Sequence, residues 1–191
     1  MTLPRAFYRR PVATVARDLL GCVLLSRRGR VVTAGRIVET EAYLGPEDAA
    51  SHAAFRPGAH ALLYGDGGFA YVFSAYGLHV CLNAVARPRG HPGCVLLRAL
   101  EPVAGLGAMA RRRAVPAESP RLASGPGNLA RALDVTLADN GCDLTRGRLT
   151  IGPPDAPRDF AIACGPRIGI TRATERRLRF WIGGNRFVSK L

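Results

Sequence analysis

Two carboxylates and a tyrosine alternate along one stretch of the sequence, R-I-V-E-T-E-A-Y at residues 36–43. If this stretch is a β-strand, its alternate side chains share a face, so Glu39, Glu41 and Tyr43 point the same way. Burying two carboxylates is costly unless each has a partner or a task. One positioned carboxylate can take a proton from water, so this face is a candidate site for general-base chemistry.

Aromatic residues dominate a second candidate stretch, F-A-Y-V-F-S-A-Y-G-L-H-V-C-L-N at residues 69–83. As a strand it would place Phe69, Tyr71 and Phe73 on one face, and residues 76–78 would form the exposed tip of a hairpin. An acidic strand, an aromatic strand and an exposed tip together predict a pocket that holds a flat ring beside a carboxylate.

Hydrophobic spacing and turn residues predict the elements that would position these side chains. Helices are expected at residues 11–20, 103–113 and 126–133. Further strands are expected at residues 22–25, 94–100, 149–151, 161–170 and 178–182. Strands outnumber helices and the hairpins are short, so the sequence predicts an α+β fold with a mostly antiparallel, curved sheet and flanking helices. Residues 1–191 are expected to form a single compact domain.

The charge of the chain points to a polyanionic partner. Its formal net charge is +13, and all but one of its 27 basic residues are arginine. A planar guanidinium grips phosphate oxygens in pairs, and a strongly basic domain is typical of nucleic-acid binding. Charge alone is also compatible with a solvated basic surface. No amphipathic basic helix is evident, so a membrane surface is not expected as a partner.

Cysteine and histidine usage predicts neither disulfides nor a metal site, and no cofactor is expected. The five cysteines are widely spaced, without a C-x-x-C pair, and the four histidines lack the spacing of zinc ligands. No signal peptide or apolar run of bilayer length is evident. We therefore expect a reduced, cytoplasmic protein, associated with the nucleoid if the source is bacterial.

Five longer runs follow one another along the chain: E-T-E-A-Y-L-G-P-E-D (39–48), Y-G-L-H-V-C-L-N (76–83), C-V-L-L-R-A-L-E-P (94–102), S-G-P-G-N-L-A-R-A-L (124–133) and P-R-I-G-I (166–170). Together they resemble the alkyladenine (3-methyladenine) DNA glycosylase family of the mammalian type. The resemblance covers nearly the whole chain. It implies a metal-free enzyme that flips alkylated or deaminated purines (3-methyladenine, 7-methylguanine, hypoxanthine) from double-stranded DNA and hydrolyses the N-glycosidic bond. The enzyme is expected to act as a monomer.

The resemblance also implies catalytic roles for three residues of this chain. Glu41 matches the general base that activates water. Arg98, the one charged residue in the apolar run at 94–100, matches the group that holds this water together with the main-chain carbonyl of Ile168. Arg98 beside Glu41 would also keep the carboxylate ionised.

Other positions match the residues that bind the base. Tyr43, His52 and Phe73 would sandwich it, and the backbone near Ala50 and His52 would read its edge. Asn83 would reject guanine by crowding its exocyclic amine. Phe73 departs from the tyrosine that is common at this place, so the stacking face is kept and the hydroxyl is lost.

The hairpin tip and the scarcity of lysine complete the expected mechanism. Tyr76 matches the side chain that wedges into the duplex, with Leu78 as its apolar neighbour. Glycosylases that also cut the strand attack the sugar with an amine. The only lysine, Lys190, lies close to the C-terminus, where chains are usually solvated, and arginine stays protonated. A monofunctional enzyme that uses water is therefore expected.

Each role has a structural alternative. Glu41 and Arg98 could form a purely structural ion pair, and Glu39 is a rival acid on the same face. His52 could be a loop histidine bonded to backbone, and Asn83 could cap a turn.

Alternatives also remain for the tip and for the whole protein. Residues 76–77 could form only a hairpin turn, and residues 125–128 could either begin a helix or hold a DNA phosphate on free N–H groups. The chain could be a nucleic-acid binding module without catalysis, or an enzyme that acts on RNA.

Overall fold

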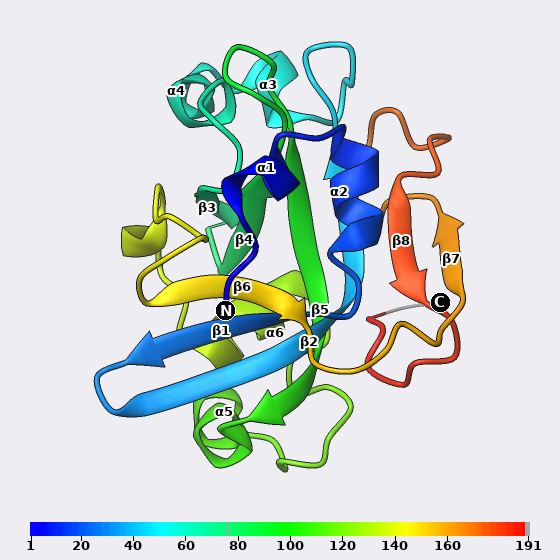
Figure 1. The fold of residues 1–191 in the computed structure, drawn as a ribbon. Helices are drawn as coiled ribbons and strands as arrows, with labels where there is room; N and C mark the ends of the chain where they lie inside the picture. Colours follow the sequence, from blue (N-terminus) through cyan, green and yellow to red (C-terminus); the bar gives the residue numbers. More distant parts are fainter. Residues whose placement is uncertain (76, 190–191) are drawn as a thin grey trace.

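The fold is built around one curved antiparallel sheet (Figure 1). A computed structural model describes residues 1–75 and 77–189. Within them eight strands pair in the order β3-β4-β5-β2-β1-β6, with β8 added beside β2 and β7 beside β8. The strands are β1 (Cys22–Arg28), β2 (Val31–Tyr43), β3 (Ala70–Ala75), β4 (His79–Val85), β5 (Cys94–Ala104), β6 (Leu149–Pro154), β7 (Ile162–Gly165) and β8 (Arg179–Ile182).

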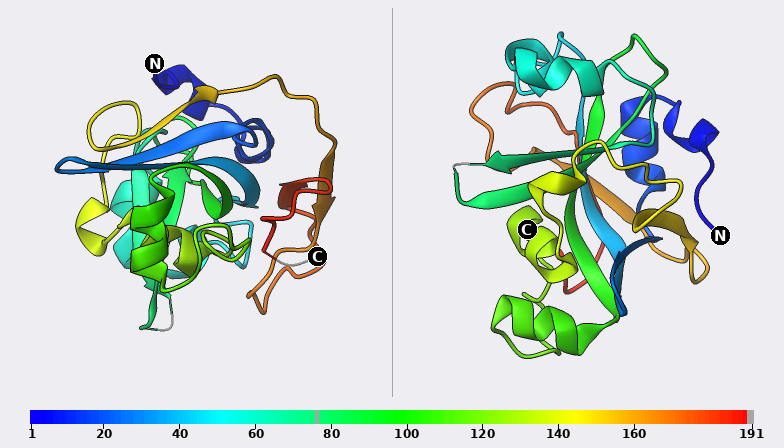
Figure 2. Two further views of the ribbon diagram at one scale, coloured as in Figure 1. Left: turned by 90° about the horizontal axis from the view of Figure 1, so that it is seen from below. Right: turned by 90° about the vertical axis from the view of Figure 1, so that its left-hand side faces the viewer.

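Short helices cover both faces of this sheet. They are α1 (Arg5–Tyr8), α2 (Val12–Asp18), α3 (His52–Phe55), α4 (His60–Leu63), α5 (Leu106–Arg113) and α6 (Pro126–Leu133), with single turns of 3₁₀-helix η1 (Pro57–Ala59) and η2 (Leu137–Asp139). Figure 2 shows α2 and α6 on opposite sides of the central strands β2 and β5. The α+β class predicted from the sequence, with a mostly antiparallel curved sheet and flanking helices, is confirmed.

Helix α6 shows how local sequence determines an element that borders the site. Pro126 occupies its first turn, where a missing N–H has no cost. Four apolar side chains bury one face of the helix against the sheet: Leu129, Ala130, Ala132 and Leu133. Asp134 ends the helix in a left-handed conformation with φ 58°. The predicted bounds, 126–133, are those observed.

Strand β2 is the longest strand and carries the acidic face. Its first half pairs with β1 and its second half with β8, while its other edge follows β5. The β2–β5 register shifts on either side of Glu39, and these bulges leave Arg98 without a Cα partner between Leu97 and Ala99. Bulges re-aim side chains, and here they bring Arg98 to the acidic face of β2.

The alternation predicted for β2 is confirmed. Arg98 contacts both Glu39 and Glu41, so these two side chains share a face. Thr40 points the other way, where its hydroxyl donates to the carbonyl of Ala16 in α2 at 2.8 Å. The functional face of the strand is therefore opposite the face covered by α2.

Several predicted elements were wrong in extent. Strands β1, β5 and β6 run three or four residues beyond their predicted ends. The helix expected from residue 103 begins only at Leu106, because Pro102 and Ala104 still pair with β2. Gly105 makes the turn with φ 73°, and a Cβ there would lie 2.3 Å from the carbonyl oxygen of Val32. The strand expected at 161–170 is only β7, because beyond Gly165 the chain turns towards the acidic face of β2.

Two further structural findings bear on the expected class of protein. All five cysteines are free thiols. In the part of the chain that the structure describes, no helix is long and apolar enough to cross a membrane.

Candidate active site

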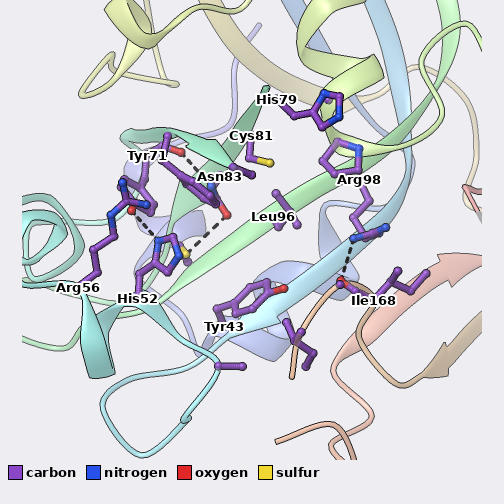
Figure 3. Close-up of a pocket in the computed structure, with 18 of the residues that line it drawn as sticks. Tyr43, His52, Arg56, Tyr71, His79, Cys81, Asn83, Leu96, Arg98 and Ile168 are labelled. Carbon is purple, nitrogen blue, oxygen red and sulfur yellow. Dashed lines mark hydrogen bonds between the residues drawn. The ribbon is translucent and has the colours of Figure 1, made fainter. Parts of the chain in front are cut away.

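A cavity of about 830 Å³ opens on the face of the sheet opposite α2. Strands β3, β4 and β5, helix α3, the start of α6 and the loop at residues 168–172 contribute to its lining. Figure 3 shows His52 and Tyr71 on one side of the cavity and Arg98 and Ile168 on the other, with Tyr43 between them. Elements distant in sequence therefore assemble one site.

Of the three residues expected to be catalytic, Arg98 and Ile168 line this cavity, and Glu41 lies directly behind them. Glu41 is fully buried, and its Oε1 accepts a hydrogen bond from the Ile168 N–H at 2.8 Å. Arg98 Nη1 lies 3.2 Å from the same oxygen and 3.5 Å from the Ile168 carbonyl oxygen (Figure 3). The Tyr43 hydroxyl donates to Glu41 Oε2 at 2.8 Å. The carboxylate is thus held in a fixed orientation by three neighbours.

The electrostatics of Glu41 have opposing components. Burial raises the pKa of Glu41 above its ordinary value, whereas Arg98, the Ile168 N–H and the Tyr43 hydroxyl lower it. Arg98 therefore favours the ionised form, as expected, but the effect of burial is larger and the net direction is upward. A raised pKa makes a carboxylate a stronger base, which suits proton abstraction near neutral pH.

Glu39, the rival acid, is fully occupied by structural contacts. Its Oε1 lies 2.7 Å from Arg179 Nε and 3.2 Å from Arg98 Nε. Its Oε2 accepts from the Ser189 N–H at 2.7 Å. Glu39 and Glu41 are equally buried, but the three partners of Glu41, namely Tyr43, Arg98 and Ile168, all line the cavity, whereas Arg179 and Ser189, which bind Glu39, do not. These contacts assign Glu39 to holding the arginines and the C-terminal segment.

An ion pair that the sequence analysis did not single out supports the Tyr43 side of the cavity. Arg167 Nη1 and Nη2 lie 2.6 and 2.8 Å from the two carboxylate oxygens of Asp48, and both side chains are buried. The Arg167 guanidinium also lies 4.7 Å from the centre of the Tyr43 ring. Both residues belong to runs that carry the family resemblance, but nothing in their spacing indicated that they pair.

Asp48 also organises the loop that leads into α3. It accepts hydrogen bonds from the backbone N–H groups of Leu44 and Ala50, at 3.1 and 3.3 Å. Burial alone would raise the pKa of Asp48, but Arg167 and these N–H groups hold it below its ordinary value. Asp48 is therefore a buried anion that fixes the backbone next to Ala50.

The structure brings the five expected base-binding residues to the same cavity, whose lining includes Tyr43, Ala50, His52, Phe73 and Asn83. The rings of His52 and Phe73 lie 4.5 Å apart, centre to centre. Asn83 is buried and donates from its amide to the Tyr71 carbonyl at 3.0 Å (Figure 3). That bond fixes the orientation of the amide on the cavity wall.

The expected wedge residue, Tyr76, lies outside the described residues, in the sequence between β3 and β4. Its neighbour Leu78 is 82% exposed, the most exposed large apolar side chain after Met1 in the described part of the chain. Gly77 has φ 68°, a left-handed conformation that glycine adopts without strain. The tip therefore presents an apolar side chain next to the cavity.

The segment for which two interpretations were open, residues 125–128, both begins α6 and lines the cavity. Among the residues described, no group of three or more histidine, cysteine or acidic side chains could hold a metal ion.

Comparisons with known proteins agree with this arrangement. A model of the family described as "Methylpurine-DNA glycosylase (MPG)" matches residues 6–186. A protein of Koribacter versatilis is 47% identical over 191 residues, covering 98% of this chain and 92% of the relative. A protein of Methanoculleus marisnigri is 46% identical over 193 residues, covering both chains completely. Both relatives carry the provisional name 3-methyladenine DNA glycosylase.

The chain belongs to the methylpurine-DNA glycosylase family. It is a DNA glycosylase, a hydrolase of N-glycosyl bonds that serves DNA repair, and its substrate is DNA. The family expected from the sequence is thereby confirmed. Its narrower assignment to the mammalian type stays a prediction, since these relatives are bacterial and archaeal.

Proposed function

We propose that this glycosylase flips alkylated or deaminated purines of the 3-methyladenine, 7-methylguanine or hypoxanthine type from double-stranded DNA. Water activated by Glu41 then hydrolyses the N-glycosidic bond. The observation that carries the proposal is the fixed Glu41 carboxylate, bonded to Tyr43, Arg98 and Ile168, three residues that line an aromatic cavity.

Recognition begins with the duplex. The arginine-rich chain neutralises phosphates, and the hairpin tip with Tyr76 and Leu78 fills the gap that the base leaves. Extrusion costs a few kcal/mol and costs less for a damaged pair, which favours lesions over normal bases. Tyr43 on one side and Phe73 on the other then enclose the base, and His52 borders it.

The cavity suits both the charge and the shape of these bases. A purine methylated on a ring nitrogen is cationic, and the faces of Tyr43 and Phe73 attract cations. Asn83 restricts the space near the base edge, and the backbone at Ala50 and His52 supplies polar groups that read it. Together these groups would favour modified purines over guanine.

The chemical step needs one carboxylate. Glu41 takes a proton from a water molecule that Arg98 and the Ile168 carbonyl hold, and the oxygen attacks the anomeric carbon of the sugar. A cationic alkylpurine is a good leaving group and departs as a neutral base, so a single positioned carboxylate suffices where sugar hydrolases commonly use two. Hypoxanthine carries no such charge, so it departs as an anion that takes a proton from solvent. A binding module without catalysis would have no need for this buried, oriented acid.

The experiment that tests the proposal is a panel of duplexes, each with one modified purine, assayed for release of the free base. We expect release of at least one alkylated or deaminated purine, an intact abasic strand and no adduct on borohydride treatment. Release from none of them would contradict the proposal. A borohydride-trapped adduct would refute a monofunctional mechanism, and faster release from matched RNA would reassign the substrate.

We further propose that the enzyme acts as a monomer in the cytoplasm, associated with the nucleoid in a bacterium. The high positive charge, which makes protomers repel one another, supports a monomer. Five free thiols support a reducing compartment. Light scattering on the purified protein and its DNA complex measures the oligomeric state, and a mass of two protomers per duplex would refute the monomer.

A further inference from the structure

A polar chain that the proposed mechanism does not use lies across the cavity from Glu41. The Tyr71 hydroxyl is 2.7 Å from His52 Nδ1. Arg56 lines the cavity beside them, its charge opposes the rise in the pKa of Tyr71 that burial causes, and its guanidinium lies 5.3 Å from the centre of the Phe73 ring. Figure 3 shows the Arg56 side chain beside the Tyr71 hydroxyl, with the bond to His52 on the other side of that oxygen.

The donors around Tyr71 determine which ring nitrogen of His52 carries the proton. A guanidinium only donates hydrogen bonds, so the Arg56 cation beside the Tyr71 oxygen favours an O–H that points away from it (Figure 3). His52 Nδ1, 2.7 Å from that oxygen, is then the acceptor and carries no proton. A neutral imidazole whose Nδ1 accepts carries its proton on Nε2.

His52 is also neutral around pH 7. Burial and then the charge of Arg56 lower the pKa of His52 to about 4. In residues 1–75 and 77–189, Nε2 has no recorded hydrogen-bond partner. The ring is thus poorly suited to give up a proton and well suited to donate a hydrogen bond to a ligand in the cavity.

The orientation of His52 indicates how it meets a base. Its ring is tilted by 61° to the ring of Phe73. A flat base that stacks on Phe73 therefore cannot stack on His52 as well, and meets the imidazole edge first. The Tyr71 ring packs against Phe73 at 29° and the Tyr71 hydroxyl binds His52, so one residue maintains both orientations.

We propose that Arg56 and Tyr71 are positioning residues that hold His52 as an Nε2–H donor to the edge of the extruded purine. The ligand class is a purine with an unshared electron pair on the nitrogen or oxygen that faces His52. A purine alkylated at that atom loses the hydrogen bond, so this chain discriminates among lesions. The inference rests on the proposed function, because it requires a purine in the cavity.

The first test needs no DNA. In the ¹⁵N-labelled protein, long-range ¹H–¹⁵N spectra of the imidazoles should show His52 as a single Nε2–H tautomer, assigned by its loss in His52→Gln. Tyr71→Phe should abolish this tautomer preference, and Arg56→Gln should weaken it. Arg56→Lys keeps a hydrogen-bond donor and adds no acceptor, so it should retain the preference that Arg56→Gln loses. Tyr64→Phe and Arg30→Gln are the matched controls. An Nδ1–H tautomer of His52 in the unmodified protein would overturn the inference.

The second test measures binding to a purine that lacks one acceptor. Duplexes with hypoxanthine, 7-deazahypoxanthine, 3-deazahypoxanthine or unsubstituted purine remove N7, N3 or O6 in turn, and Glu41→Gln protein prevents turnover. Removal of the atom that accepts from His52 should weaken DNA binding by Glu41→Gln. The loss of affinity should be about three- to tenfold larger with Tyr71 present than with Tyr71→Phe added, which is the effect expected for one hydrogen bond. The inference would be overturned if, for each of the three probes, the loss of binding affinity were the same with Tyr71 present as with Tyr71→Phe.

The two proposals fail in different ways. If no modified purine is released but both tests succeed, the hydrolytic function is refuted and His52 stands as a donor in a purine-binding site. If release proceeds while either test fails, the glycosylase proposal stands and the role assigned to Arg56 and Tyr71 is refuted.

Discussion

The backbone N–H of Ile168 donates to Glu41 Oε1 at 2.8 Å and so joins segments 127 residues apart in the sequence. The carbonyl of the same residue faces Arg98 at 3.5 Å. One peptide segment therefore fixes the carboxylate and also borders the space where a water molecule would be held. This double contact supports Glu41 as the base and makes its geometry depend on the loop at 168–172.

Glu41→Gln should retain DNA binding and lose base release. The side chain keeps nearly the same shape but no longer accepts a proton, and a positioned base contributes about 10²–10⁴-fold in rate. Single-turnover release of the base, with binding measured separately, checks this. Glu101→Gln on β5 makes the same chemical change away from the cavity and should keep the original rate. Unchanged release by Glu41→Gln would remove Glu41 from the mechanism.

The acid limb of the pH–rate profile should report Glu41. Because burial raises its pKa, kcat/KM for a cationic substrate should fall as the pH drops through a value above the ordinary range of glutamate. Arg98 favours the ionised form, so Arg98→Gln should move this limb to higher pH. A limb that moves to lower pH, or none at all, would contradict the assigned electrostatics.

Asp48→Asn should destabilise the fold strongly, by about 3–5 kcal/mol, because it leaves the Arg167 charge buried without a counter-ion. Removing both charges, with Asp48→Asn and Arg167→Met together, should lower the free energy of unfolding by less than Asp48→Asn alone. Urea unfolding measures both. Arg9→Gln, which breaks the surface pair with Asp66, should leave the urea midpoint nearly unchanged.

The same pair predicts the pH dependence of stability. The folded-state pKa of Asp48 is depressed, so its contribution is complete above the ordinary value of about 3.9 and is lost as the pH falls through the lower folded-state value. The variant with both Asp48→Asn and Arg167→Met should lose less stability over that acid range than the unmodified protein. Identical losses in these two proteins would contradict a stabilising role for Asp48 ionisation.

Leu78→Ala should lower excision from duplex DNA more than it lowers non-specific binding. The side chain is exposed at the hairpin tip and has few contacts to lose in the free protein, while phosphate contacts remain. Tyr76→Ala is predicted from the sequence to have a larger effect in the same direction. Single-turnover excision from duplexes, compared with single strands that need no wedge, measures both. Equal rates for Tyr76→Ala and the unmodified protein would make Tyr76 only a turn residue.

Local patterns in the sequence were enough to predict several elements. Alternation along β2 places Glu39 and Glu41 on one face, and Pro126 with the apolar spacing after it defines α6, because both signals lie within a few residues of one another. The ordered runs were enough to predict the family. The residues that the resemblance assigned to base binding were expected in one cavity, and all of them line one: Tyr43, Ala50, His52, Phe73 and Asn83.

Contacts between distant segments decided the rest. Glu39 and Glu41 are equivalent in strand geometry, and only Arg179 and Ser189, brought in by β8 and the C-terminal segment, distinguish the structural acid from the candidate base. Val103 and Ala104 extend as part of a strand because β2 lies beside them, although the sequence pattern predicted a helix from Val103. The Asp48–Arg167 pair spans 119 residues, and a sequence holds no local signal for two charges that meet only when the sheet has formed.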